Sequence, residues 1–139
     1  MYLAIEPLNR FETDMVNIAE QAFRICEEVD NPYIKMMLDT FHMNIEEKSV
    51  GDAIRAAGPR LIHLHSCEND RGAPGSGNVA WDEVAQALKD IDYDGPVVIE
   101  SFTADVKSIA KAAAIWRPLA VSQDALASDG LAFLKQKLA

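Results

Sequence analysis

The sequence predicts a parallel α/β protein, a (βα)4 half of a TIM barrel followed by one more C-terminal helix. Four short apolar segments each end in a side chain of a type that binds metals, namely Glu6, Asp39, His65 and Glu100. These four residues are 33, 26 and 35 positions apart, which is about the length of one βα unit. The intervening stretches have the spacing of amphipathic helices. Alternating strands and helices form parallel sheets, so the four side chains are expected at one edge.

The number of βα units indicates half of a barrel. Eight such units in about 250 residues close a TIM barrel, whereas this chain of 139 residues has four. We therefore interpret residues 1–139 as a single domain. The competing interpretation is a small open, doubly wound sheet. It is disfavoured because no glycine-rich phosphate loop follows the first predicted strand.

The predicted strands cover residues 2–6, 33–39, 61–65 and 96–100. The last of them, Pro-Val-Val-Ile, is followed at once by Glu100. In barrels of parallel strands the active-site residues lie at the carboxyl ends of the strands, so this position favours a chemical role. A second histidine, His63, is assigned a structural role, on the opposite side of the sheet from His65 or displaced by a bulge.

The predicted helices fill the intervals between the strands. The first is expected to begin at Thr13 or Asp14, which are good N-caps, and to stop at Asn31-Pro32. The others are expected near residues 49–57, 79–90, 106–116 and 125–138. Residues 40–44 are expected to form a loop. The longer loop at 66–78 is polar and includes Arg71, and loops of this length in compact domains are usually functional or disordered.

Composition limits the classes of function. The net charge of −9 disfavours nucleic-acid binding, because phosphate backbones are neutralised by Lys and Arg. No apolar run approaches the ~20 residues of a membrane span. The first predicted strand begins almost at Met1, which leaves no room for a signal peptide. Two distant cysteines, Cys26 and Cys67, argue against a disulfide framework and favour a reducing compartment, so a cytoplasmic protein is expected.

Three carboxylates and one imidazole predict a hard, oxygen-rich metal site at the carboxyl edge of the sheet. Such a set is typical of sites for Mn²⁺, Mg²⁺ or Co²⁺, whereas structural zinc sites are rich in thiolates. Each acid alone is explained as well by a helix cap or a salt bridge. The recurrence of the pattern at four strand ends is what favours a shared metal.

Four segments also resemble a known family. They are Glu6–Glu12 (EPLNRFE), Leu38–His42 (LDTFH), His63–Gly72 (HLHSCENDRG) and Val98–Phe102 (VIESF). Together they resemble the ketose 3-epimerases, the D-tagatose and D-psicose 3-epimerases of the xylose isomerase-like TIM barrel superfamily. The resemblance runs over nearly the whole chain, but only to the C-terminal half of that family's barrel.

The resemblance implies a role for seven residues. It implies that Glu6, Asp39, His65 and Glu100 bind the metal, with Mn²⁺ favoured and Mg²⁺, Co²⁺ or Zn²⁺ as alternatives. It also implies that the sugar substrate is held by three further residues, Glu12, His42 and Arg71. Epimerisation at C3 removes a proton next to a carbonyl, and a divalent ion stabilises the resulting ene-diolate. Two carboxylates on opposite faces of that carbon, Glu6 and Glu100, are expected to take and return the proton.

Plainer assignments remain open for the substrate-binding set. His42 fits a surface loop, Arg71 a salt bridge, and Glu12 the first turn of a helix, where the dipole favours an acid. For the whole chain, one alternative is a non-catalytic half-barrel remnant that binds metal and oligomerises. A less favoured alternative is a metal phosphodiesterase of the endonuclease IV type, which would need more His and Asp ligands and a basic groove.

The missing half of the barrel also has a consequence for association. It leaves the first and last strands as open edges and one face of the sheet uncovered, and open edges favour pairing. The chain is therefore expected to be a fragment, a truncated gene product, or a homo-oligomer in which two copies cover each other's open face.

Overall fold

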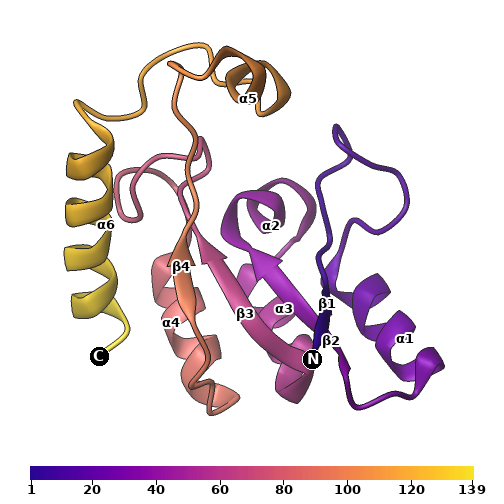
Figure 1. Cartoon of the computed structure of the whole chain (residues 1–139). Helices are drawn as coiled ribbons and strands as arrows, with labels where there is room; N and C mark the ends of the chain where they lie inside the picture. Colours follow the sequence, from indigo (N-terminus) through magenta and orange to yellow (C-terminus); the bar gives the residue numbers. More distant parts are fainter.

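A single four-stranded parallel sheet organises the chain, and the computed structural model describes all 139 residues (Figure 1). The strands are β1 (Leu3–Ile5), β2 (Ile34–Asp39), β3 (Leu61–Ser66) and β4 (Val97–Ile99). They lie in the order β1-β2-β3-β4, so every strand pairs with its neighbour in sequence. A doubly wound sheet reverses its strand order, whereas a barrel does not. The half-barrel prediction is therefore confirmed.

Six α-helices and one 3₁₀ turn connect and follow the strands. They are α1 (Ala19–Val29), α2 (Thr40–Glu46), α3 (Val50–Ala57), η1 (Gly58–Arg60), α4 (Trp81–Asp90), α5 (Lys107–Ala112) and α6 (Gln123–Lys137). Figure 1 shows α5 near the carboxyl ends of the strands, while α6 runs beside α4. No helix combines the length and the apolar composition that crossing a membrane requires.

The core lies between one face of the sheet and helices α1, α3 and α4. Met36, Leu38 and Leu64 point from the strands into this layer, where they are inaccessible to solvent together with Ile54 and Val84. Because alternate residues of a strand face opposite sides, these buried residues show which face of the sheet packs against the helices. The polar side chains at the strand ends are therefore carried by strands whose other face is packed against the helices.

The other face of the sheet lacks such a covering layer. Its side chains include Lys35, Met37 and His63, which are half-buried, and Val98, which is 40% exposed. The outer edges of β1 and β4 pair with no other strand. This face corresponds to the interior of a complete barrel, where side chains from all strands fill the space.

His63 lies on the same face as His65, and their ring centroids are 4.9 Å apart. The prediction that the two histidines lie on opposite sides is wrong, because residues two apart in a strand share a face. The register does shift between Met36 and Met37, where Ile62 is left without a partner. This irregularity precedes both histidines and does not separate them.

Three helix predictions need correction. Helix α1 begins at Ala19 rather than at Thr13 or Asp14, because the preceding residues fold back: the Leu8 amide donates to the Val16 carbonyl at 3.0 Å. Residues 40–44, expected to be a loop, belong to α2, whose first turn is capped by Asp39. Helix α5 ends at Ala112, earlier than expected, and the chain turns at Ala114, which has a φ of +54°.

Candidate metal centre

The four side chains expected to bind metal come from four adjacent strands. Asp39 is the last residue of β2 and His65 lies near the end of β3, while Glu6 and Glu100 directly follow β1 and β4. Asp39 and His65 are partners in the register of the two central strands. Because the strands are parallel, all four residues lie at one edge of the sheet, as the sequence predicted.

These side chains converge around the ring of His65. Its Nδ1 lies 3.3 Å from Glu100 Oε1, 3.7 Å from Asp39 Oδ2 and 4.0 Å from Glu6 Oε1. Ligand atoms of Glu6, Asp39 and His65 all lie within 4.8 Å of one another, and the structure therefore contains a possible metal site. Glu100 lies outside this mutual group, and its Oε2 contacts Arg71.

The residues fit a divalent cation. His65 Nδ1 is buried and has no hydrogen-bond partner, which is uncommon for a polar atom inside a protein. Three carboxylates surround it and supply hard oxygen donors, and the imidazole nitrogen completes the set. This combination suits Mn²⁺ or Mg²⁺ better than a thiolate-binding metal.

Burial and mutual repulsion shift the titration of the carboxylates. Burial, followed by the charge of Asp39, raises the pKa of Glu6 to about 7. Burial also raises the pKa of Glu100. Burial opposes ionisation of Asp39 too, but the neighbouring His65 and Arg71 outweigh it and lower the pKa of Asp39. The same Asp39 carboxylate raises the pKa of His65. Neighbouring carboxylates thus hinder one another's ionisation at the place where a cation would bind.

Arg71 reaches into this cluster from the long loop after β3. Its Nη1 donates to Asp39 Oδ2 at 2.6 Å and to Glu100 Oε2 at 2.5 Å. The guanidinium carbon lies 4.1 Å from the centre of the Phe41 ring, a cation–π distance. Burial would lower the pKa of Arg71, but the charge of Asp39 outweighs it and raises the pKa. Arg71 therefore stays a cation beside the candidate metal ligands.

His42 and Glu12 lie next to Arg71. Arg71 Nη2 is 3.1 Å from Nε2 of His42, which is buried in α2. On the other side of the ring, the backbone amide of Asn9 donates to His42 Nδ1 at 3.1 Å. The side-chain amide of Asn9 lies 2.9 Å from the same nitrogen and donates to Glu12 Oε1 at 2.8 Å. Of the three residues expected to hold the sugar, Arg71 contacts the metal cluster, His42 contacts Arg71, and Glu12 is linked to His42 through Asn9.

Sequence reasoning missed two residues of this neighbourhood. Asn9, which is buried, joins Glu12 to His42. Cys67 donates from Sγ to Asp39 Oδ1 at 3.4 Å, and burial, followed by the charge of Asp39, raises the pKa of its thiol to about 12. Neither residue belongs to a periodic pattern. Their signals were their position in loops next to expected site residues and their place inside two of the segments that carry the family resemblance, Glu6–Glu12 and His63–Gly72.

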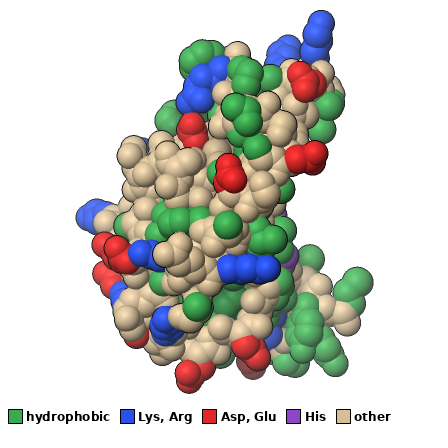
Figure 2. Space-filling model, turned by 90° about the vertical axis from the view of Figure 1, so that its left-hand side faces the viewer, with side chains coloured by type: hydrophobic (Ala, Val, Ile, Leu, Met, Phe, Trp, Pro, Cys, Tyr) green, Lys and Arg blue, Asp and Glu red, His purple; other side chains and the backbone are tan.

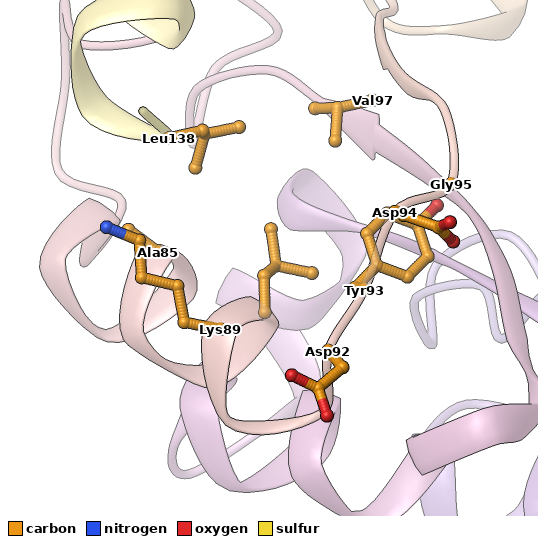
Figure 3. Close-up of a pocket in the computed structure, with 9 residues that line it drawn as sticks. Ala85, Lys89, Asp92, Tyr93, Asp94, Gly95, Val97 and Leu138 are labelled. Atoms are coloured by element: carbon orange, nitrogen blue, oxygen red, sulfur yellow. The ribbon is translucent and has the colours of Figure 1, made fainter.

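Two cavities differ in their relation to the cluster. A cavity of about 330 Å³ is lined by Glu12, Arg71 and Phe102 together with residues of α5, and it opens beside the candidate ligands. A larger one, of about 460 Å³, lies between the end of α4, Tyr93–Gly95, the start of β4 and Leu138 (Figure 3). Because Gly95 precedes β4, this second cavity lies at the amino-terminal ends of the strands, whereas the metal cluster lies at their carboxyl ends.

Comparison with known proteins agrees with this architecture. Residues 1–137 match the family model described as Xylose isomerase-like TIM barrel. The chain is 47% identical over 133 residues to a probable ketose 3-epimerase of Synechocystis sp., covering 96% of this chain and 46% of that protein. It is 44% identical over 129 residues to D-psicose 3-epimerase of Enterocloster bolteae, covering 91% of this chain and 43% of that protein.

Solved structures give the same result. A crystal structure of D-psicose 3-epimerase in the presence of D-fructose superposes with a TM-score of 0.93 at 43% identity, covering 99% of this chain and 50% of that one. An L-ribulose 3-epimerase structure superposes with a TM-score of 0.94 at 38% identity, covering 99% and 47%. The chain spans about half the length of these relatives. The chain therefore belongs to the xylose isomerase-like TIM barrel family, and its homologues are ketose 3-epimerases.

Proposed function

We propose that this chain is the metal-binding half of a ketose epimerase, a divalent-metal-dependent sugar isomerase that moves a proton through an ene-diolate. Residues 1–139 would form one domain, the C-terminal half of the barrel. The observation that carries the proposal is the convergence of Glu6, Asp39, His65 and Glu100 at the ends of four adjacent parallel strands. The similarity to ketose 3-epimerases supports the choice of a ketose as substrate.

Glu6, Asp39, His65 and Glu100 would hold the metal, with Mn²⁺ preferred and Mg²⁺, Co²⁺ or Zn²⁺ as alternatives. When bound, such an ion supplies Lewis-acid polarisation of the ketose carbonyl and the adjacent hydroxyl. The buried, unpartnered Nδ1 of His65 supports this assignment, because nothing in the chain satisfies that atom. Asp39 is shielded from solvent and would anchor the set.

Glu6 and Glu100 would exchange the proton at C3. The strand order supports this pair, since β1 and β4 are the outer strands and place the two carboxylates on either side of Asp39 and His65. In the metal-free chain, burial and the charge of Asp39 raise the pKa of Glu6 to about 7, so this carboxyl group takes up a proton more readily than a free glutamate does. One carboxylate would remove the proton from one face of the carbon and keep it, and the other, protonated at the start, would deliver its own proton to the opposite face.

Glu12, His42 and Arg71 would hold the sugar oxygens. Two donors of Asn9 point at His42 Nδ1, so Nδ1 acts as an acceptor and the neutral ring carries its proton on Nε2. Nε2 and Arg71 Nη2, which are 3.1 Å apart, would then both be donors. A sugar oxygen between them would accept from both, and this arrangement supports binding of a hydroxyl or carbonyl group there. Glu12 would accept a hydrogen bond from a neighbouring hydroxyl.

The open face of the sheet would be covered by a second copy of the chain. Half-buried and exposed side chains of β2, β3 and β4 lie on it, and both edge strands lack an outer partner. The space-filling view from the α6 side shows further hydrophobic side chains exposed among charged ones (Figure 2). Such a homo-oligomer would enclose the sugar from the side that the missing βα units cover in a full barrel.

We assign the chain to the cytoplasm because its two cysteines, Cys26 and Cys67, are free.

Proton exchange at C3 tests the function directly. The purified chain would be loaded with Mn²⁺ and incubated with D-psicose or D-fructose in D₂O, and deuterium at C3 followed by NMR. Glu6→Gln and Glu100→Gln should each abolish exchange, while Glu83→Gln, which changes an exposed carboxylate of α4, should leave it intact. Mn²⁺ binding without any exchange by the wild-type chain would favour the alternative, a non-catalytic half-barrel that binds metal.

A further inference from the structure

Glu68 is a fully buried carboxylate that none of the steps above uses. It lies one residue beyond Cys67, at the start of the loop that connects β3 to α4. Both of its oxygens accept hydrogen bonds from the far end of that loop. Oε1 accepts from the Gly75 amide at 2.7 Å and from Trp81 Nε1 at 2.6 Å, and Oε2 accepts from the Val79 amide at 3.0 Å.

The same residue holds the near end of the loop through its backbone. The Glu68 carbonyl accepts from the Arg71 amide at 2.9 Å, and its amide donates to the Gly72 carbonyl at 3.1 Å. This turn places Arg71 in the left-handed region, with a φ of +70°. A residue with a side chain occupies that region at some cost, so surrounding contacts must hold it there.

A second contact fixes Arg71 from the side of β4. The hydroxyl of Ser101, the residue after Glu100, donates to the Arg71 carbonyl at 2.7 Å. The Arg71 backbone is thus held between Glu68 and Ser101, and its guanidinium extends from this point to Asp39 and Glu100. Burying a carboxylate costs free energy unless the carboxylate accepts hydrogen bonds. All the donors to Glu68 lie between Gly75 and Trp81, the end of this loop and the first residue of α4.

We propose that Glu68 is a positioning residue, which ties both ends of the loop between Glu68 and Trp81 so that Arg71 presents its guanidinium to the substrate. The part of this inference that concerns substrate rests on the proposed function. Glu68 itself does not touch the reacting atoms. Glu68 acts through the backbone conformation of Arg71. Its replacement should therefore weaken substrate binding only while Arg71 is present.

The first experiment measures whether Glu68 closes the loop. Cys67 is buried under it, and its thiol becomes accessible when the loop opens. In a Cys26→Ala background, Glu68→Gln should raise the rate of Cys67 modification by a disulfide reagent at least tenfold, because the amide nitrogen of Gln faces an N–H donor instead of accepting from it. Trp81→Phe, which removes one of the donors and retains the aromatic ring, should raise the rate less. Glu83→Gln is the charge-matched control and should have no effect.

The urea-unfolding midpoint of each variant separates loop opening from global unfolding. If Glu68→Gln accelerates Cys67 modification only in proportion to its loss of global stability, Glu68 is a general packing residue and the proposal is overturned. An unchanged modification rate in a folded Glu68→Gln variant overturns it as well.

The second experiment is a double-mutant cycle on ketose binding to the Mn²⁺-loaded chain, measured by calorimetry. Glu68→Gln should weaken binding of D-psicose about tenfold in the wild-type background and less than twofold in an Arg71→Gln background. Equal losses in both backgrounds would show that Glu68 does not act through Arg71. A wild-type chain that binds no ketose would refute the proposed function and the substrate part of this inference, while Cys67 modification would still decide whether Glu68 closes the loop.

Discussion

Arg71 Nη1 lies 2.6 Å from Asp39 Oδ2, so a guanidinium occupies one side of the cluster in which the metal is expected. Both side chains are almost completely shielded from solvent. The contact neutralises an aspartate that no other cation of the chain reaches at salt-bridge distance, apart from His65 when it is protonated. Arg71 and a metal ion would therefore interact with the same carboxylates, and this relationship leads to the first prediction.

Arg71→Gln should destabilise the metal-free protein by about 3–5 kcal/mol, because Asp39 is left as a buried charge with a weakened partner. Mn²⁺ should restore more stability to this variant than it adds to the wild-type protein. Thermal unfolding with and without Mn²⁺ measures both effects. The control is Arg55→Gln, which breaks pairs with Asp52 and Asp90 on the surface and should cost far less, because exposed ion pairs contribute little to stability. Equal losses for the two variants would contradict the prediction.

Mn²⁺ affinity should depend on pH through Glu6. Metal ligands bind in their deprotonated form, and burial together with Asp39 raises the pKa of Glu6 to about 7. Affinity should therefore rise with pH, by roughly tenfold between pH 6 and pH 8 from the protonation of Glu6 alone. Calorimetric titration at several pH values tests this dependence. In Glu6→Gln the affinity should be lower and this part of the pH dependence absent; an unchanged pH profile would show that another group is responsible.

Stability of the metal-free protein should also respond to pH through Glu6. The folded state raises the pKa of Glu6 from 4.5 to about 7, so between these values it binds more protons than the unfolded chain does. Stability should consequently fall as pH rises across this interval. Urea unfolding at pH 5 and pH 7.5 should show a larger decrease for the wild-type protein than for Glu6→Gln. A decrease of the same size in both proteins would assign the effect to other groups, such as Glu100 or Glu47.

Asn9→Ala should disturb the tautomer of His42. The two donors that point at Nδ1 come from the backbone and the side chain of Asn9, and the substitution removes the side-chain donor together with its bond to Glu12. Ketose affinity should fall about three- to tenfold, the value of one net hydrogen bond. Nitrogen NMR of the imidazole should show a smaller population of the Nε2-protonated form. Asn44→Ala, on the exposed side of α2, should leave both measurements unchanged.

Oligomerisation through the open face predicts a sensitivity to charge on β4. Val98 lies on that face and is 40% exposed. Val98→Asp should shift the wild-type oligomer toward monomer in light scattering coupled to gel filtration, because burying a carboxylate against a second copy is unfavourable. The control Val121→Asp changes a valine that is 97% exposed near the start of α6 and should not affect assembly. A wild-type monomer at all concentrations would refute the oligomer.

Part of the candidate site could be read from the chain because it repeats. An apolar run followed by Glu6, Asp39, His65 or Glu100 occurs at intervals of one βα unit, and parallel strands bring their carboxyl ends to one edge. The strand order and the presence of a helix between successive strands followed from the same alternation. The prediction for His63 failed through an error of strand geometry and not through a missing signal, since residues two apart share a face.

Other features had no local signal. The residues expected to begin the first helix are not helical, because the Leu8 amide donates a hydrogen bond to the Val16 carbonyl. Helix α2 forms where a loop was expected, because Asp39 caps it. The links from Asn9 to His42 and from Glu68 to Trp81 span 33 and 13 residues. No periodic pattern encodes such pairs, because each depends on where the folded sheet places two loops.

By itself, the sequence determined the class of fold, the four strand ends and the chemical types of side chain that they present, since these depend on local alternation and hydrophobic spacing. Only the tertiary structure decided that Arg71 contacts two of the candidate metal ligands, that Asn9 contacts His42, and that Glu68 accepts hydrogen bonds from Gly75, Val79 and Trp81. The physical reason is that these are contacts between buried polar groups. Their partners are selected by distance and hydrogen-bond geometry in three dimensions and not by separation along the chain.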